Sequence, residues 1–239
     1  MQLFRSLLFT AYMMVSACLY GAFMALCFWL PYSMHFAIAR SWARSIFWLL
    51  ERLCGLKFTV EGRERIPEGN HIVMCNHTSA WETIAHFVIF PPQVWVLKRE
   101  LLWIPFVGWG LKLLRPIAIN RGEGHRAVNQ VLEQGKSRLA DGLWIIIFPE
   151  GTRVVAGRAR KFGVSGALLA IAAGKLIVPF SHNAGAFWPR RGILKKPGTV
   201  RVVIGEPILS AGKDARDLTE ETRQAIETGL TRIANCIDR

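Results

Sequence analysis

The stretch with the clearest chemical potential is Asn76–Glu82, which reads N-H-T-S-A-W-E and places a carboxylate five residues after a histidine. A neutral imidazole can take a proton from a hydroxyl group near pH 7. It does so better when a carboxylate holds its other ring nitrogen, because that contact fixes the tautomer and stabilises the imidazolium. The pattern predicts that His77 is a general base and that Glu82 orients it.

The spacing limits where the two residues can lie. Five residues on one continuous helix would place the side chains about 140° apart, facing away from each other. A pair therefore requires His77 in a loop and Glu82 in the first helical turn. There is an alternative, because Ser79 and Glu82 also form the S-x-x-E pattern of a capping box. In that case Glu82 caps a helix and His77 is an ordinary loop histidine, and the seven residues leave both possibilities open.

A second stretch, Phe148–Arg153, reads F-P-E-G-T-R and follows a strongly apolar run. Gly151 allows a tight turn or a close approach to a ligand. Arg153 offers a planar fork of donors that suits a phosphate. The simple alternative is a surface turn with an ordinary salt bridge. Positive charge also occurs at two other predicted strand edges, on Lys98, Arg99 and Arg121.

The N-terminal region is predicted to anchor the chain in a membrane. Residues 6–30 contain no charged side chain and end at Pro31. This run exceeds the ~7–15-residue core of a signal peptide and suffices for the ~20 residues that a membrane span needs. Residues 34–53 form a second predicted helix that is rich in Trp and carries arginines. The region either spans once or returns as a helical hairpin, and Arg40, Arg44 and Arg52 favour a cytoplasmic location for the rest of the chain.

Beyond this anchor the chain predicts an α/β fold with a mixed, largely parallel sheet covered by helices. We expect residues 1–53 to form the anchor and residues 54–239 to form one domain. Apolar, β-branched runs predict strands at 57–62, 71–76, 94–99, 143–148, 175–180 and 200–205. Helical patterns lie between them at 80–90, 123–140, 165–173 and 217–235.

Composition excludes several classes of protein. A net charge of +13 favours a polyanionic partner, and a mean hydropathy of +0.26 with nine Trp favours a membrane over nucleic acid. The five cysteines are odd in number and form no C-x-x-C pair, which favours a reducing compartment. His71, Cys75 and His77 match no usual zinc signature, so we expect no metal. Motifs for serine hydrolases, Walker loops and dinucleotide sites are absent from the sequence.

Taken together, the motifs resemble those of the glycerolipid acyltransferase family. Asn76–Glu82 resembles the first motif, N-H-x-x-x-x-D. The second is similar to Lys98-Arg99-Glu100-Leu101 with Pro105, Gly108 and Ile119-Asn120-Arg121, and Phe148–Arg153 looks like the third. Ile177-Val178-Pro179 looks like the fourth. The run V-P-F-S-H-N-A-G-A-F-W-P-R-R-G at 178–192 resembles the proteobacterial 1-acyl-glycerol-3-phosphate acyltransferases.

This resemblance implies acyl transfer from a thioester carrier to the free hydroxyl of a lysophosphatidate, at the cytoplasmic face of a bacterial inner membrane. It implies that His77 and Glu82 are catalytic. It assigns the acceptor's phosphate to Lys98, Arg121, Glu150, Gly151, Thr152 and Arg153. No cofactor or metal is implied beyond the acyl carrier, either coenzyme A or acyl carrier protein. The expected partners are membrane lipids and the lysophospholipid acceptor, and nucleic acid is not one.

The sequence departs from the family pattern at two positions. The acid of the pair is Glu82 where relatives more often have Asp, and Gly163 stands where many relatives have Lys. Arg158, Arg160 and Lys161 are the nearby candidates to supply that charge. Two alternatives follow: an acyltransferase for another lysolipid, such as lyso-ornithine lipid, and a non-catalytic protein that binds anionic lipid.

Overall fold

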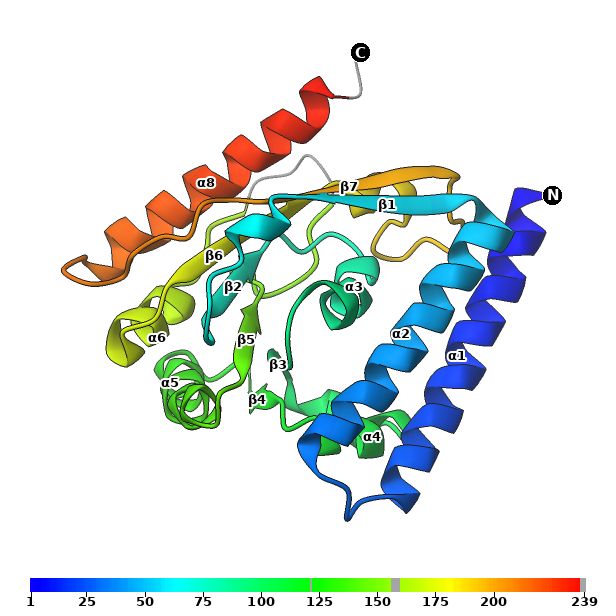
Figure 1. The fold of residues 1–239 in the computed structure, drawn as a ribbon, viewed down its shortest axis with the longest axis horizontal. Helices are drawn as coiled ribbons and strands as arrows, with labels where there is room; N and C mark the ends of the chain where they lie inside the picture. Colours follow the sequence, from blue (N-terminus) through cyan, green and yellow to red (C-terminus); the bar gives the residue numbers. More distant parts are fainter. Residues whose placement is uncertain (121, 156–159, 237–239) are drawn as a thin grey trace.

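The computed structural model describes residues 1–120, 122–155 and 160–236, and these form an α/β fold (Figure 1). Within these ranges seven strands make one sheet in the order β1-β7-β6-β2-β5-β3-β4. Neighbouring strands run parallel except for the antiparallel pair β6–β7, so the predicted mixed and largely parallel sheet is confirmed. The strands are β1 Leu56–Glu61, β2 Ile72–Cys75, β3 Gln93–Lys98, β4 Ile117–Ile119, β5 Trp144–Ile147, β6 Ile177–His182 and β7 Gly198–Ile204.

The helices after the anchor are also close to prediction. The four predicted helices correspond to α3 Trp81–Ile89, α5 His125–Ala140, α6 Ser165–Ala173 and α8 Ala215–Asn235. Several short elements were not predicted: β4, α4 Val107–Leu113, α7 Ala184–Phe187, and the 3₁₀ turns η1 Arg63–Arg65 and η2 Arg99–Trp103. Each is too short to show a clear hydrophobic period.

Helices cover both faces of the sheet, with α5, α6 and α8 on one side and α2 and α3 on the other (Figure 1). Strand β5 shows how this arrangement arises. Its residues alternate between the two cores, with Ile145 and Ile147 packed in one and Trp144 and Ile146 in the other. All four are buried, so the strand is apolar throughout and lacks polar alternation. The site described below lies at one end of this doubly covered sheet.

The N-terminal region forms a two-helix hairpin, which is one of the two arrangements that the sequence allows. Helix α1, Gln2–Leu26, packs beside α2, Tyr32–Cys54 (Figure 1). Helix α1 is long and apolar enough to cross a membrane, and no other helix in the described ranges is. Its apolar character suggests membrane anchoring. Large apolar side chains are exposed on α1 and on the neighbouring 103–109 segment, among them Leu3, Phe4, Leu7, Leu8, Leu19, Phe23, Trp103, Phe106 and Trp109.

Helix α1 is fixed to the α/β body near both of its ends. Near its C-terminus, a Cβ atom on Gly21 would lie 2.4 Å from the carbonyl oxygen of Phe106, so glycine permits the close approach of α4. Near its N-terminus, the buried Lys195 donates from Nζ to Thr10 Oγ1 at 2.6 Å. The Lys195 carbonyl accepts from Gln2 Nε2 at 2.6 Å. The hairpin therefore belongs to the same packed unit as the sheet.

Candidate active site

The candidate residues gather at one edge of the sheet. Strands β6, β2, β5, β3 and β4 run parallel, so their carboxyl ends meet at the same edge, where open α/β sheets bind ligands. His77 follows β2 and Glu150 follows β5. Lys98 ends β3, and His182 ends β6. Residues far apart in the sequence are thus presented on one side of the molecule.

His77 and Glu82 form the predicted pair. The distance from His77 Nδ1 to Glu82 Oε1 is 2.7 Å. Glu82 lies in the first turn of α3 and His77 in the preceding loop, as the spacing requires. Glu82 is fully buried, and His77 is nearly so at 7% exposure. Because Nδ1 donates to the carboxylate, the basic nitrogen of the neutral imidazole is Nε2.

Glu82 also performs part of the alternative capping role. The same Oε1 atom accepts from the backbone N–H of Ser79 at 2.9 Å and of Thr78 at 3.1 Å. Ser79 Oγ accepts from the N–H of Trp81, so only the glutamate half of a capping box forms in the usual way. The two interpretations of this segment therefore apply together, since one carboxylate oxygen both holds the histidine and caps the chain entering α3.

The ionisation of Glu82 follows from its neighbours. Burial by itself raises the pKa of a carboxyl group. Here the imidazoles of His182 and His77, together with the Ser79 N–H, outweigh that effect, and the pKa of Glu82 lies below its ordinary value. Glu82 is therefore a carboxylate at neutral pH. A negative charge at this point can stabilise an imidazolium on His77.

His77 is joined directly to the F-P-E-G-T-R segment. Its backbone N–H donates to Glu150 Oε2 at 3.0 Å, and its carbonyl accepts from the N–H of Val154 at 2.7 Å. Its ring stacks on Phe148, with ring centroids 4.0 Å apart. The two motifs, separated by about seventy residues of sequence, thus form one structural unit, with the segment after β5 wrapped around the histidine.

Glu150 has an unusual ionisation at this site. Burial, only partly offset by the hydrogen bond from the His77 N–H, raises its pKa to about 7. Its role in substrate binding stays a prediction. What the geometry gives is a carboxylate that positions the His77 backbone and changes its charge near neutral pH.

A second histidine, His182, was missed in the sequence. Its Nε2 donates to the Asn76 carbonyl at 2.8 Å, and its Nδ1 accepts from the N–H of Ala184 at 3.1 Å, which fixes the tautomer. Burial lowers its pKa, so the ring is neutral. The Asn76 side chain also bonds to both backbone polar groups of His182. These bonds fix the residue just before His77, and they place His182 Nε2 3.7 Å from Glu82 Oε2.

The other residues that the sequence predicts to bind substrate have different surroundings. Gly151 has a positive φ of 69°, and its N–H donates to the Phe148 carbonyl. Thr152 Oγ1 accepts from Arg190 at 3.4 Å. Arg153 is half-buried, and its Nε has no hydrogen bond within the described part of the chain. Lys98 is exposed and forms an ion pair with Glu100 at 2.8 Å. Arg121 and Arg158 lie outside the described residues.

The known proteins that this chain resembles are acyltransferases. The sequence profile of the family described as "Acyltransferase" matches residues 57–183. A 1-acyl-sn-glycerol-3-phosphate acyltransferase of Pseudomonas aeruginosa is 39% identical over 94% of this chain and 88% of its own. A lyso-ornithine lipid O-acyltransferase of the same organism is 28% identical over 77% of each chain. The crystal structure of a 1-acyl-sn-glycerophosphate acyltransferase of Thermotoga maritima shares the fold, with a TM-score of 0.81 at 24% identity and coverage of 98% and 96%.

The raised pKa of Glu150 predicts a specific loss of stability with pH. Between the ordinary value of 4.5 and the folded value of about 7, the unfolded chain releases this proton while the folded chain keeps it. The contribution of Glu150 is therefore fully present below pH 4.5 and is lost as pH rises through about 7. From pH 5 to pH 7.5, the wild type should lose about 2 kcal/mol more free energy of unfolding than Glu150→Gln. Urea titrations of both proteins in mild detergent measure this, and equal losses would contradict it.

Proposed function

The chain belongs to the acyltransferase family, and we propose that it moves a fatty acyl chain from an acyl thioester to the free hydroxyl of 1-acyl-sn-glycerol-3-phosphate, giving phosphatidic acid. The observation that carries this proposal is the buried His77–Glu82 pair at the carboxyl edge of the sheet, joined to the F-P-E-G-T-R segment. The near full-length similarity to the Pseudomonas enzyme supports the same acceptor. The reaction belongs to phospholipid biosynthesis.

The mechanism that we propose is direct transfer. His77 Nε2 takes the proton of the acceptor's hydroxyl, and the hydroxyl oxygen attacks the thioester carbonyl. The new C–O bond forms, the C–S bond breaks, and the thiolate leaves with the proton that His77 returns. Glu82, which contacts His77 Nδ1 at 2.7 Å, stabilises the imidazolium that exists between these steps.

The substrate-binding roles are part of the same proposal. Glu150, Gly151, Thr152 and Arg153 follow β5 and hold the acceptor's phosphate, with Lys98 at the end of β3 and Arg121 as further contributors. The acyl donor is a thioester of coenzyme A or of acyl carrier protein. A lyso-ornithine lipid is the second candidate acceptor. It is favoured by the glycine at position 163 and by the similarity to a lyso-ornithine lipid acyltransferase.

Residues 1–53 act as the membrane anchor and residues 54–239 as the acyltransferase domain. The domain faces the cytoplasm at the bacterial inner membrane. Arginines on α2 support this orientation, since positively charged residues flanking apolar helices favour the cytoplasmic side. The cysteines also support it, because all five are free, as in a reducing compartment.

The activity is tested with the purified full-length protein, a labelled acyl thioester and a panel of acceptors. We expect phosphatidic acid from 1-acyl-sn-glycerol-3-phosphate, at a higher rate than transfer to lyso-ornithine lipid, and no transfer by His77→Ala beyond about 1% of wild type. Preference for lyso-ornithine lipid would contradict the proposed acceptor. Full turnover by His77→Ala would contradict the mechanism, and lipid binding without any transfer by the wild type would favour the non-catalytic alternative.

The Glu82→Gln variant distinguishes the proposed catalytic role of the Glu82 charge from the role of its side chain as a helix cap. Glutamine keeps an oxygen that can accept from the Thr78 and Ser79 N–H groups, but it lacks the charge that stabilises the imidazolium. We expect kcat to fall about 10²–10⁴-fold with little change in melting temperature. Both quantities are measured on the same preparation. If the variant melts earlier but keeps its turnover per folded molecule, Glu82 is a helix cap and not a catalytic residue.

The orientation is tested with a reporter fused after Arg239. A reporter that is active only in the cytoplasm should be active, because the anchor keeps the α/β domain on that side. Deletion of residues 1–30 should also weaken membrane association, which is measured by fractionation. A periplasmic reporter signal would overturn the orientation without affecting the proposed chemistry.

A further inference from the structure

The segment that follows β6 carries a basic group to the F-P-E-G-T-R turn. Arg190 lies beyond α7, and its Nη2 donates to Thr152 Oγ1 at 3.4 Å. Arg190 and Arg191 line a pocket of about 550 Å³ together with Thr78, Val155, Gly185, Pro189 and Gly192. None of these lining residues is acidic. The pocket is therefore positively charged and has no carboxylate of its own to neutralise it.

This pocket lies directly beside the proposed general base. Thr78 is the next residue after His77, and the N–H of Val154, which precedes Val155, donates to the His77 carbonyl. Thr78 and Val155, which line the pocket, are therefore the sequence neighbours of the two partners in this hydrogen bond, His77 and Val154. An anionic group in the pocket would be close to the hydroxyl that His77 deprotonates, as the phosphate of a small glycerophospholipid must be.

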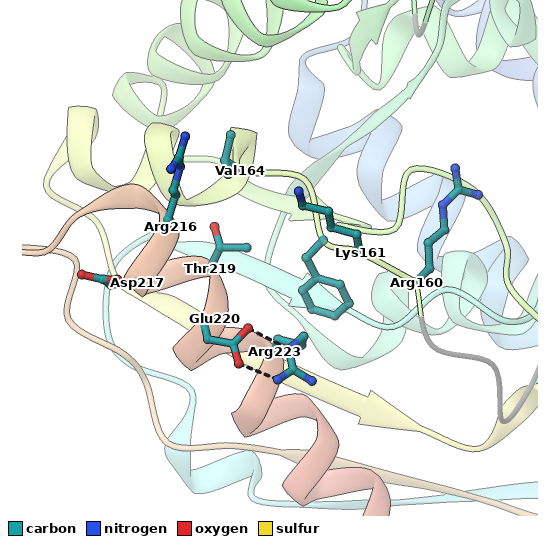
Figure 2. Close-up of a pocket in the computed structure, with 9 residues that line it drawn as sticks. Arg160, Lys161, Val164, Arg216, Asp217, Thr219, Glu220 and Arg223 are labelled. Carbon is teal, nitrogen blue, oxygen red and sulfur yellow. Dashed lines mark hydrogen bonds and ion pairs between the residues drawn. The ribbon is translucent and has the colours of Figure 1, made fainter.

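Two further cations, Arg160 and Lys161, follow this turn in the sequence and are placed differently. Arg160 and Lys161 line a separate pocket of about 780 Å³ against α8 (Figure 2). That pocket also contains Asp217 and Glu220, and Glu220 is paired with Arg223. These two carboxylates offset part of the pocket's positive charge. Arg160 acts on Glu150 as the last of the causes that set its pKa, which Arg160 lowers.

Position 163, where many relatives have lysine, offers no charge at all. Gly163 has no side chain, and its N–H donates to the Pro149 carbonyl at 2.8 Å. The charge that many relatives carry at position 163 is therefore missing here, and Arg153 is the turn's own cation. Arg190 is in hydrogen-bond contact with the turn and comes from a segment outside the acyltransferase profile match at 57–183.

We propose that Arg190, assisted by Arg191, binds the phosphomonoester of the lysophosphatidate acceptor and makes the enzyme prefer a phosphorylated acceptor to an uncharged one. This inference rests on the proposed function and names a binding residue for it. A guanidinium can form two parallel hydrogen bonds to a phosphate, and the present contact with Thr152 orients it toward the turn. The pocket takes the acceptor's headgroup.

The test compares Arg190→Gln with Arg160→Gln in the full-length enzyme. Both variants remove one exposed arginine charge, so folding should survive, and melting temperature is the check. We measure KM for 1-acyl-sn-glycerol-3-phosphate, KM for the acyl thioester, and the rate of transfer to unphosphorylated 1-acylglycerol. Arg190→Gln should raise the acceptor KM about 10–100-fold, leave the donor KM unchanged, and leave transfer to 1-acylglycerol unchanged. Arg160→Gln should leave the acceptor KM unchanged.

Arg190→Lys adds a second criterion, because it keeps the charge but loses the fork of donors. Its acceptor KM should lie between those of wild type and Arg190→Gln. An unchanged acceptor KM in Arg190→Gln, a rise in the donor KM alone, or a loss that follows Arg160 instead would each overturn the inference. Wild-type enzyme that makes no phosphatidic acid would overturn the proposed function itself, so the two failures are distinguishable.

Discussion

A single oxygen atom, Oε1 of Glu82, accepts hydrogen bonds from three groups, and the site depends on it. Its donors are His77 Nδ1 and the backbone N–H groups of Thr78 and Ser79. A fully buried carboxylate would cost several kcal/mol if it were unpaired. These three donors offset that cost. The same bonds set the tautomer of the histidine, the path of the loop and the start of α3, so the geometry of the pair and the local fold are stabilised together.

The other end of α3 is held by the N-terminal helical hairpin. Arg40 on α2 donates from Nε to the Phe87 carbonyl at 2.9 Å and from Nη2 to the Phe90 carbonyl at 3.0 Å. Carbonyls at the end of a helix lack partners within the helix, and a positive charge there also complements the helix dipole. The helix that carries Glu82 in its first turn therefore ends on an arginine of the hairpin. The apolar surface of the hairpin and the His77–Glu82 pair are thereby joined through one short helix.

The sequence allowed the sheet and the His77–Glu82 contact to be predicted because both leave local signals. Runs such as 143–148 are apolar on both faces, and Asn76–Glu82 carries its chemistry within seven residues. His182 had no such signal. The predicted strand at 175–180 ended two residues before the real end of β6, which placed the histidine outside the strand. Its bonds to Asn76 cross 106 residues of sequence. Arg190 likewise had no local signal, because only the folded chain brings it into contact with Thr152.

The presence of Glu82 in place of the commoner aspartate follows from its double role. Glu82 lies inside α3, yet its carboxylate reaches back to the N–H groups of residues that precede the helix. An aspartate on the same backbone would be shorter by one carbon–carbon bond, about 1.5 Å. It could not keep all of these contacts unless the loop moved toward the helix. That loop is held by Asn76 on one side and by the Val154 N–H on the other. In this chain the longer acid therefore suits a loop whose position is already determined by its neighbours, and this accounts for a departure that the sequence alone leaves unexplained.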